Sequence, residues 1–325
     1  MKKLFLIGIT CFAMQAHAQY FHRFFNETIL FPPFRDEAFD DGLKSRVNYA
    51  GGDPQNYYFA ATGSSEMAIG GNSDARLRFL HTAKNGTAKA NTAFQFADVT
   101  PKWYETRGKD LCEIDNGQGT GGYIIVGEVN DNPATDALGI PGFTDWFFGK
   151  FTNSGGVSTK KRIDIDSGAD VAHGVIRSLA VAGTYLVCGY SIKAAHVNAV
   201  VARITDAGAV VWLRSFNFVT PQVPCYTTSQ CFAYSLCENP ATGEIYVCGT
   251  IAGHKPGADR DGLLFAVSSA GFPLWQIYHD AGQSYDEYHD IKFTSNGYLL
   301  VCGFSDLATN LPNPFNDTWI SLFAP

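Results

Sequence analysis

Three aspartates lie close together in the stretch DIDSGAD, as Asp164, Asp166 and Asp170. Hard cations such as Ca²⁺ bind several carboxylate oxygens, and one tight turn can bring three of them together. The stretch lacks the closing glutamate of an EF-hand loop, and the alternative is a solvated linker between two structural units. The sequence therefore suggests a candidate metal site, and calcium is the only cofactor that it suggests.

Aromatic residues beside loop-forming residues are the candidates for ligand binding. They are Tyr57, Tyr58, Trp103, Tyr104 and Trp146. Flat rings at a loop surface can stack on the face of a sugar or fill a pocket of a partner protein. Aromatic side chains also fill the cores of β proteins, and this is the alternative for each of the five residues.

Two histidines occupy similar local sequences, because His173 and His289 each follow an aspartate by three residues, Asp170 and Asp286. A histidine and a carboxylate in such a pair can act as acid and base. A position that recurs along a chain is also typical of a structural role, and we expect these residues to stabilise the turn that leads into a strand.

Four acidic residues are candidates for an enzyme site at the centre of the fold: Asp110, Asp170, Glu238 and Asp286. Glycoside hydrolysis needs two carboxylates that converge from different parts of the chain. Nothing in the sequence separates these acids from surface acids. A serine hydrolase is not indicated, because the chain has no G-x-S-x-G motif.

A repeated sequence phrase indicates the secondary-structure elements that must position these residues. It occurs as TYLVCGYS (184–191), IYVCGTI (245–251) and YLLVCGFS (298–305), and aligned glycines fall at Gly71, Gly127, Gly189, Gly249 and Gly303. A second apolar run, preceded by Asp or Asn, follows each glycine. Short runs rich in β-branched and aromatic residues favour strands, and repeats of this length are typical of propeller blades.

The repeated phrase itself is expected to be the second strand of each blade, buried on both faces. Its cysteines, Cys188, Cys248 and Cys302, then act as small buried residues, and its glycine lets adjacent sheets approach closely. Outside the phrase, Cys225 and Cys231 flank a short turn and could form a disulfide in an oxidising compartment.

The order of these motifs resembles a known family. The motifs follow one another in a fixed order: G-x-h-h-h-x-G (h, apolar), then an aspartate with a long apolar run ending at G-x-h-x-W, then G-x-S-x-D-x-x-H. This order is similar to that of the SBBP-type repeats of secreted bacterial β-propeller proteins. The likeness is clearest from Thr144 to Phe304 and departs at Thr159, where the tryptophan would fall. The resemblance implies an all-β propeller and no particular function.

We therefore expect one β-propeller domain over residues 19–325, with five four-stranded blades. The repeats span approximately 36–100, 101–163, 164–219, 220–279 and 280–325. The last repeat ends after its third strand, and an open strand edge exposes unpaired backbone groups. The apolar segment Phe21 to Phe31 is predicted to supply the missing outer strand of the fifth blade.

The first 18 residues predict a secretory signal peptide cleaved after Ala18. Two lysines precede an apolar run that is too short to span a bilayer, and the run leads into an A-x-A site. We expect the mature protein to be secreted, periplasmic or held at the cell surface, without a membrane span.

The charge balance bears on partners, because the chain carries a formal net charge of −7 and no basic run. Nucleic acid is therefore not expected as a partner. Since no catalytic motif stands out, the sequence favours a monomeric binding or scaffold module for a protein or polysaccharide partner, and not an enzyme. The alternative is a glycoside hydrolase-like enzyme with carboxylates at the propeller axis.

Overall fold

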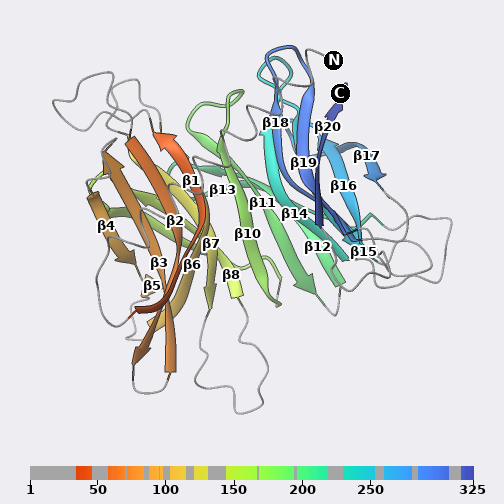
Figure 1. Cartoon of the computed structure of the whole chain (residues 1–325). Helices are drawn as coiled ribbons and strands as arrows, with labels where there is room; N and C mark the ends of the chain where they lie inside the picture. The colour runs from red at the N-terminus through yellow and green to blue at the C-terminus, as the bar shows by residue number, and fades with distance from the viewer. Residues whose placement is uncertain are drawn as a thin grey trace, which may run out of the picture.

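A computed structural model describes most of the chain and contains only strands, turns and loops in the part that it describes (Figure 1). The described residues are 34–45, 58–69, 72–83, 88–94, 96–97, 103–114, 121–130, 144–166, 168–193, 196–218, 230–252, 260–279, 285–306 and 316–325. None of them forms a helix long and apolar enough to cross a membrane. The predicted signal peptide and the segment Phe21 to Phe31 lie outside these residues.

The strands form five antiparallel units in chain order. The first unit contains β1 (Phe34–Ser45), β2 (Tyr58–Ile69), β3 (Asn72–Ala83) and β4 (Ala88–Phe94). The second contains β6 (Trp103–Glu113), β7 (Tyr123–Asn130), β8 (Thr144–Phe151) and β9 (Val157–Ile163), with the short β5 (Phe96–Ala97) paired to β6. The third contains β10 (Asp170–Arg177), β11 (Thr184–Lys193), β12 (His196–Thr205) and β13 (Val210–Phe216).

The fourth and fifth units complete the described chain. The fourth contains β14 (Gln230–Glu238), β15 (Ile245–Ala252), β16 (Arg260–Val267) and β17 (Pro273–His279). The fifth contains three strands: β18 (Tyr285–Phe293), β19 (Leu299–Asp306) and β20 (Asn316–Phe323). A single parallel pair, Val197 with Gln230, joins the third and fourth units into one sheet.

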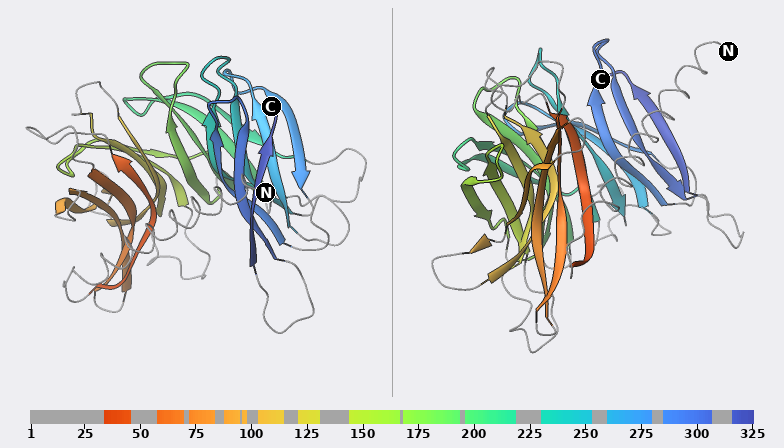
Figure 2. Two further views of the ribbon diagram at one scale, coloured as in Figure 1. Left: turned by 45° about the horizontal axis from the view of Figure 1, so that its top comes forward. Right: turned by 60° about the vertical axis from the view of Figure 1, so that its left-hand side comes forward.

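The units fan out one after another, with the first strand of each towards the inside of the arc (Figure 2). These inner strands pack on one another across the units: β6 contacts β1 and β10, and β14 contacts β10 and β18. This is the arrangement of a β-propeller, and it confirms the all-β fold class.

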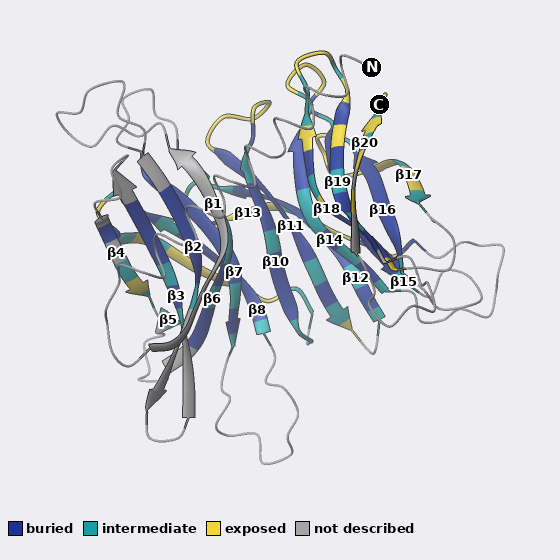
Figure 3. Cartoon of the chain, in the orientation of Figure 1, coloured by how far each residue is buried: buried dark blue, intermediate teal, exposed yellow. Residues whose placement is uncertain are grey.

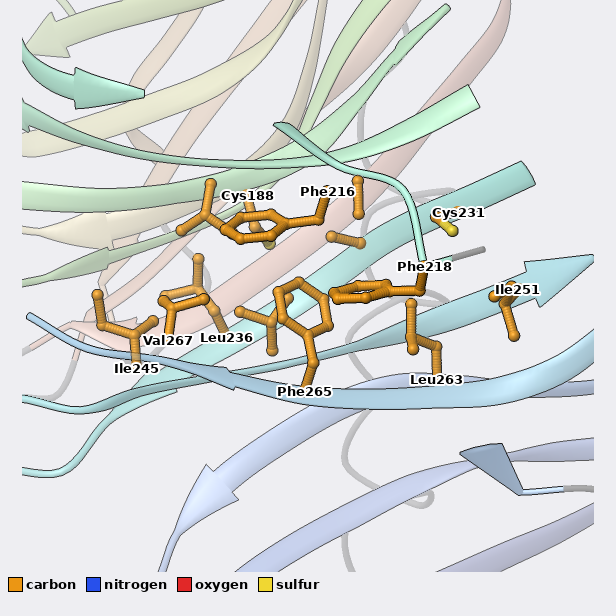
Figure 4. Close-up of a cluster of buried hydrophobic side chains, with 14 of the residues drawn as sticks. Cys188, Phe216, Phe218, Cys231, Leu236, Ile245, Ile251, Leu263, Phe265 and Val267 are labelled. Carbon is orange, nitrogen blue, oxygen red and sulfur yellow. The ribbon is translucent and has the colours of Figure 1, made fainter. Parts of the chain in front are cut away.

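Apolar side chains fill the space between successive units. One buried cluster lies between the third and fourth units, where the Phe216 and Phe218 rings stack and the Phe265 ring packs against both at a tilt (Figure 4). Equivalent clusters separate the first unit from the second, the second from the third, and the fourth from the fifth. The second and third strands of the central units are consequently buried along most of their length (Figure 3).

The prediction that the repeated phrase is a buried second strand is confirmed by β11 and β15. Cys188 and Cys248 are 0% exposed, and burial raises the pKa of both thiols well above the usual range, which keeps them unreactive. Cys302 is only half-buried. Cys231 is a free, buried thiol packed in the core, and Cys225 lies outside the described residues.

The glycine of the repeated phrase is required for a different reason from the one expected. A Cβ on Gly189 would lie 2.0 Å from the carbonyl oxygen of Val171, on the inner strand of the same unit and not on an adjacent sheet. The corresponding contacts are 1.9 Å at Gly127, 1.9 Å at Gly249 and 1.8 Å at Gly303, each with an inner-strand carbonyl. In the first unit Gly63, not Gly71, holds this place, because Gly63 pairs with Phe39 of β1.

A β-bulge in the inner strand explains these close contacts. In β10, Ala172 pairs with Gly189 and Gly174 pairs with Cys188, so that His173 is an extra residue. The same register shift occurs in the inner strand of every unit, and the extra residues are Asp40, Lys109, His173, Tyr234 and His289. A bulge bends its strand and redirects the extra side chain. In the second to fifth units, the crowding carbonyl lies two residues before the bulged residue.

Candidate functional site

A cavity of about 790 Å³ lies among the inner strands β6, β10, β14 and β18. Four bulged residues line it, one from each of the second to fifth units: Lys109, His173, Tyr234 and His289. The next residues along three of these strands, Asp110, Ser235 and Asp290, also line it, as does Lys292. The repeated bulge thus builds a polar and aromatic pocket at the propeller axis.

The aromatic rings of the pocket form a continuous set of contacts. Tyr234 lies between the two histidines, edge-on to His173 with centroids 5.3 Å apart and stacked on His289 with centroids 5.3 Å apart. His289 also stacks on Phe304 at 5.2 Å, and His173 lies 5.5 Å from Tyr190. Rings held on both sides in this way are fixed in position beside the cavity.

The charge of the histidines follows from their surroundings. Burial lowers the pKa of His173 to about 4, and the positive charges of Lys109 and His289 add to this effect. His173 is therefore a neutral imidazole at neutral pH. His289 is half exposed and lies 3.1 Å from Glu287 Oε2 through its Nε2 atom.

Two carboxylates from different units enter the pocket. Asp290 accepts a hydrogen bond from the Ser235 hydroxyl at 2.7 Å and another from Lys292 Nζ at 3.1 Å, both at Oδ1, and its side chain is 45% exposed. Asp110 accepts backbone N–H groups at both oxygens, from Leu111 at 2.7 Å and from Val175 at 2.6 Å. Asp290 is therefore the accessible carboxylate, and Asp110 is the rigidly held one.

Of the four acids predicted for a central site, only Asp110 lines this pocket. Asp170 and Asp286 are 0% exposed at the start of β10 and β18. Glu238 is buried between units, where it accepts hydrogen bonds from the Ser178 hydroxyl and from the N–H of Ala180. His173 and His289, for which a turn-stabilising role was expected, both face the pocket.

The predicted cation ligands are only partly brought together. Oxygens of Asp145, Asp164 and Asp170 lie within 4.8 Å of one another, so Asp145 takes the place expected for Asp166. Asp166 instead forms an ion pair with Lys193 at 2.6 Å. Burial raises the pKa of Asp170 to about 6.

Among the predicted ligand-binding aromatics, Trp146 is the one whose side chain the structure describes. Trp146 is 1% exposed in the core between the second and third units, where its Nε1 donates to the Tyr190 carbonyl at 3.4 Å. This ring packs in the interior instead of presenting a face to a ligand. Tyr58 opens β2, Trp103 and Tyr104 open β6, and Tyr57 lies outside the described residues.

Sequence reasoning missed Lys109, Tyr234 and Asp290. A signal was present, because the inner strands align as RGKDLC, VAHGVI, FAYSLC and EYHDIK, with the bulged residue third in each. The two histidines alone suggested a recurring position, and residues of other types at that position were not recognised as equivalent.

No protein-family model matches the sequence, and no curated protein matches it. Among solved structures, the chain is similar to a GH43 β-xylosidase/α-arabinofuranosidase from a compost microbial metagenome, with 10% identity, a TM-score of 0.41, and coverage of 88% of this chain and 91% of that one. It is also similar to an exo-1,5-α-L-arabinanase from a bovine ruminal metagenomic library (9% identity, TM-score 0.39, coverage 88% and 94%). A thermostable family-43 glycoside hydrolase gives 10% identity, a TM-score of 0.37 and 90% coverage of both chains.

These findings correct two expectations from the sequence. The chain was expected to be a binding or scaffold module and not an enzyme, whereas the similar solved structures are glycoside hydrolases. The axial pocket also holds two carboxylates from different units: Asp110, which the sequence analysis named as a candidate, and Asp290, which it did not. A likeness of this degree assigns neither a substrate nor a mechanism to this chain, and both must come from the pocket.

Proposed function

We propose that this protein is a carbohydrate-active enzyme that hydrolyses glycosidic bonds in an oligosaccharide bound at the propeller axis. The observation that carries the proposal is the presence of Asp110 and Asp290, from the second and fifth units, in one cavity of about 790 Å³. A cavity of that size suits a small ligand, and two carboxylates on separate elements are what glycoside hydrolysis requires.

The two carboxylates suit different roles. Asp290 is 45% exposed, and its Oδ1 is held by the Ser235 hydroxyl, so it can approach the anomeric carbon or activate a water molecule there. Asp110 is fixed by main-chain N–H groups at both oxygens, which keeps its carboxyl group in one place. A carboxyl group held so rigidly is suited to meeting the glycosidic oxygen at a defined position.

The aromatic side of the pocket supplies a surface for the sugar. His173, Tyr234 and His289 contact each other, so their rings are held in fixed positions where they can contact the C–H groups of a sugar. Because His173 is a neutral imidazole at neutral pH, its ring can pack on the sugar without a buried charge to compensate. These contacts would hold the substrate between the two carboxylates.

The proposal also covers where the protein acts and how its propeller ring is closed. An extracellular or periplasmic polysaccharide is a substrate that suits a protein exported by the signal peptide over residues 1–18. The ring is proposed to have five blades of the SBBP type, with Phe21 to Phe31 paired to β20. In support, β20 is the outermost strand of the three in its unit, and Ile320 and Leu322 on it are 48% and 60% exposed.

The activity is tested by incubating the protein with a panel of arabino-, xylo-, manno- and fructo-oligosaccharides and measuring the release of reducing sugar. We expect turnover of at least one class, and its loss in an Asp290→Asn variant. If no substrate is cleaved at any pH from 4 to 8, the enzyme proposal is wrong. Ring closure is tested separately, because deletion of residues 19–31 should lower the melting temperature sharply.

A further inference from the structure

A second group of acidic side chains lies between the second and third units, outside the axial pocket. Asp145 opens the apolar part of β8, Asp164 follows β9, and Asp170 opens β10. One oxygen from each lies within 4.8 Å of the other two. Asp145 and Asp170 are 2% and 0% exposed, whereas Asp164 is exposed, so the cluster is reached from solvent through Asp164.

The buried oxygen Oδ1 of Asp170 has no hydrogen-bond partner. The other oxygen, Oδ2, accepts the N–H of Ile165 at 2.8 Å and the N–H of Asp166 at 3.4 Å. These bonds hold the carboxylate in position but leave Oδ1 unsatisfied in the interior. An unsatisfied buried oxygen is costly, and a bound cation would satisfy it.

The charges of the cluster call for a divalent cation. Arg162 pairs with Asp145, so three carboxylates and one guanidinium leave two negative charges when all are ionised. The nearby Lys193 is engaged by Asp166 and does not supply the missing charge. A single divalent cation would balance the cluster, and hard cations prefer carboxylate oxygens.

We propose that Asp145, Asp164 and Asp170 bind a Ca²⁺ ion that joins the second unit to the third. Calcium accepts six to eight oxygen ligands in flexible geometry, and an open side at Asp164 leaves room for water ligands. The ion would connect β8 to the start of β10 and fix the loop between β9 and β10. The role is structural, and it does not depend on the activity proposed for the axial pocket.

The experiment uses the full mature chain, stripped with chelator and then titrated with CaCl₂ or MgCl₂ in a calorimeter. We expect one Ca²⁺ per chain, weaker binding of Mg²⁺, and a higher melting temperature with Ca²⁺ than with chelator. The Asp164→Asn variant, which changes an exposed residue and should fold normally, is expected to weaken Ca²⁺ binding at least tenfold.

Asp166→Asn is the matched control, since Asp166 lies in the same loop but pairs with Lys193. It is expected to bind Ca²⁺ like the unaltered protein. The proposal is overturned if Ca²⁺ gives neither binding heat nor a rise in melting temperature, or if Asp164→Asn binds Ca²⁺ as tightly as the unaltered protein. Loss of binding in Asp166→Asn alone would show that the ligand set is wrong.

Discussion

Tyr234 and His289 lie face to face, with ring centroids 5.3 Å apart and planes at 13°. They come from neighbouring units, and both are the extra residue of a β-bulge. A regular strand would alternate its side chains between the two faces of the sheet, whereas a bulge turns one of them towards a new direction. The axial pocket is therefore built by a backbone irregularity that every unit repeats.

Removal of the Tyr234 ring should weaken substrate binding more than it affects turnover. Tyr234→Ala takes away one face of the stack with His289, and an aromatic contact of about 1 kcal/mol corresponds to roughly a fivefold increase in KM. Tyr234→Phe keeps the ring and should retain the KM of the unaltered protein. Equal KM values for all three proteins would show that the ring does not contact the substrate.

Gly189→Ala should destabilise the protein severely. The added Cβ would lie 2.0 Å from the Val171 carbonyl oxygen, and two backbone segments of one sheet cannot separate without losing their hydrogen bonds. We expect a loss of about 3 kcal/mol or more in the free energy of unfolding, measured by urea denaturation. Gly183→Ala is the control, because no atom lies within 4 Å of its Cβ and only the positive φ of 73° opposes it, at about 1 kcal/mol.

Glu238→Gln should lower stability because it leaves a buried guanidinium without its counter-charge. The side chains of Arg203 and Glu238 are 3% and 0% exposed and are joined at 3.5 Å, and Ser178 bridges them. Breaking a buried pair from one side costs about 3 to 5 kcal/mol. Asp206→Asn removes a half-exposed partner of Lys150 and should cost less than about 1 kcal/mol. Similar melting temperatures for the two variants would contradict this assignment.

The pKa of His173 predicts how stability changes in mild acid. The imidazole has a pKa of about 4 in the folded protein and about 6.5 when unfolded, so the unfolded state binds more protons between these values. Stability from this residue is fully present above pH 6.5 and falls as the pH drops towards 4, by about 2 to 3 kcal/mol.

A His173→Gln variant isolates this contribution, because it keeps a polar side chain but does not titrate. The groups around His173 that also bear charge or titrate are Lys109, Tyr190, Tyr234 and His289, and they are unchanged in the variant. We expect the unaltered protein to lose more stability than the variant between pH 7 and pH 4.5 in urea titrations. Parallel pH profiles would mean that His173 is not a buried neutral imidazole.

The strands were predictable because their signal is local. The runs around Cys188 and Cys248 are apolar, β-branched and bounded by turn residues, so they are strands wherever the chain places them. The sequence left two alternatives open for Trp146, a loop surface and the core, because the neighbouring residues do not indicate the apolar cluster that receives its ring.

The sites were less predictable because they depend on pairing between distant segments. The bulge at Tyr234 can be recognised only from the register of β14 against β15, because no residue type in the sequence predicts it. Asp145 joins Asp164 and Asp170 because β8 packs beside β10, although Asp145 lies 19 positions before Asp164 in the sequence. The local spacing that pointed to Asp166 could not show this contact.

The central claim is that the axial carboxylates act on a glycosidic bond, and the most direct test compares kcat for the unaltered protein and three variants. On an oligosaccharide that the protein cleaves, Asp290→Asn and Asp110→Asn should each lower kcat at least a hundredfold, while Asp206→Asn, outside the pocket, should leave it unchanged. Melting temperatures of all four proteins would establish that they are folded. If folded Asp290→Asn and Asp110→Asn cleave the substrate as fast as the unaltered protein, the axial pocket is not the catalytic site.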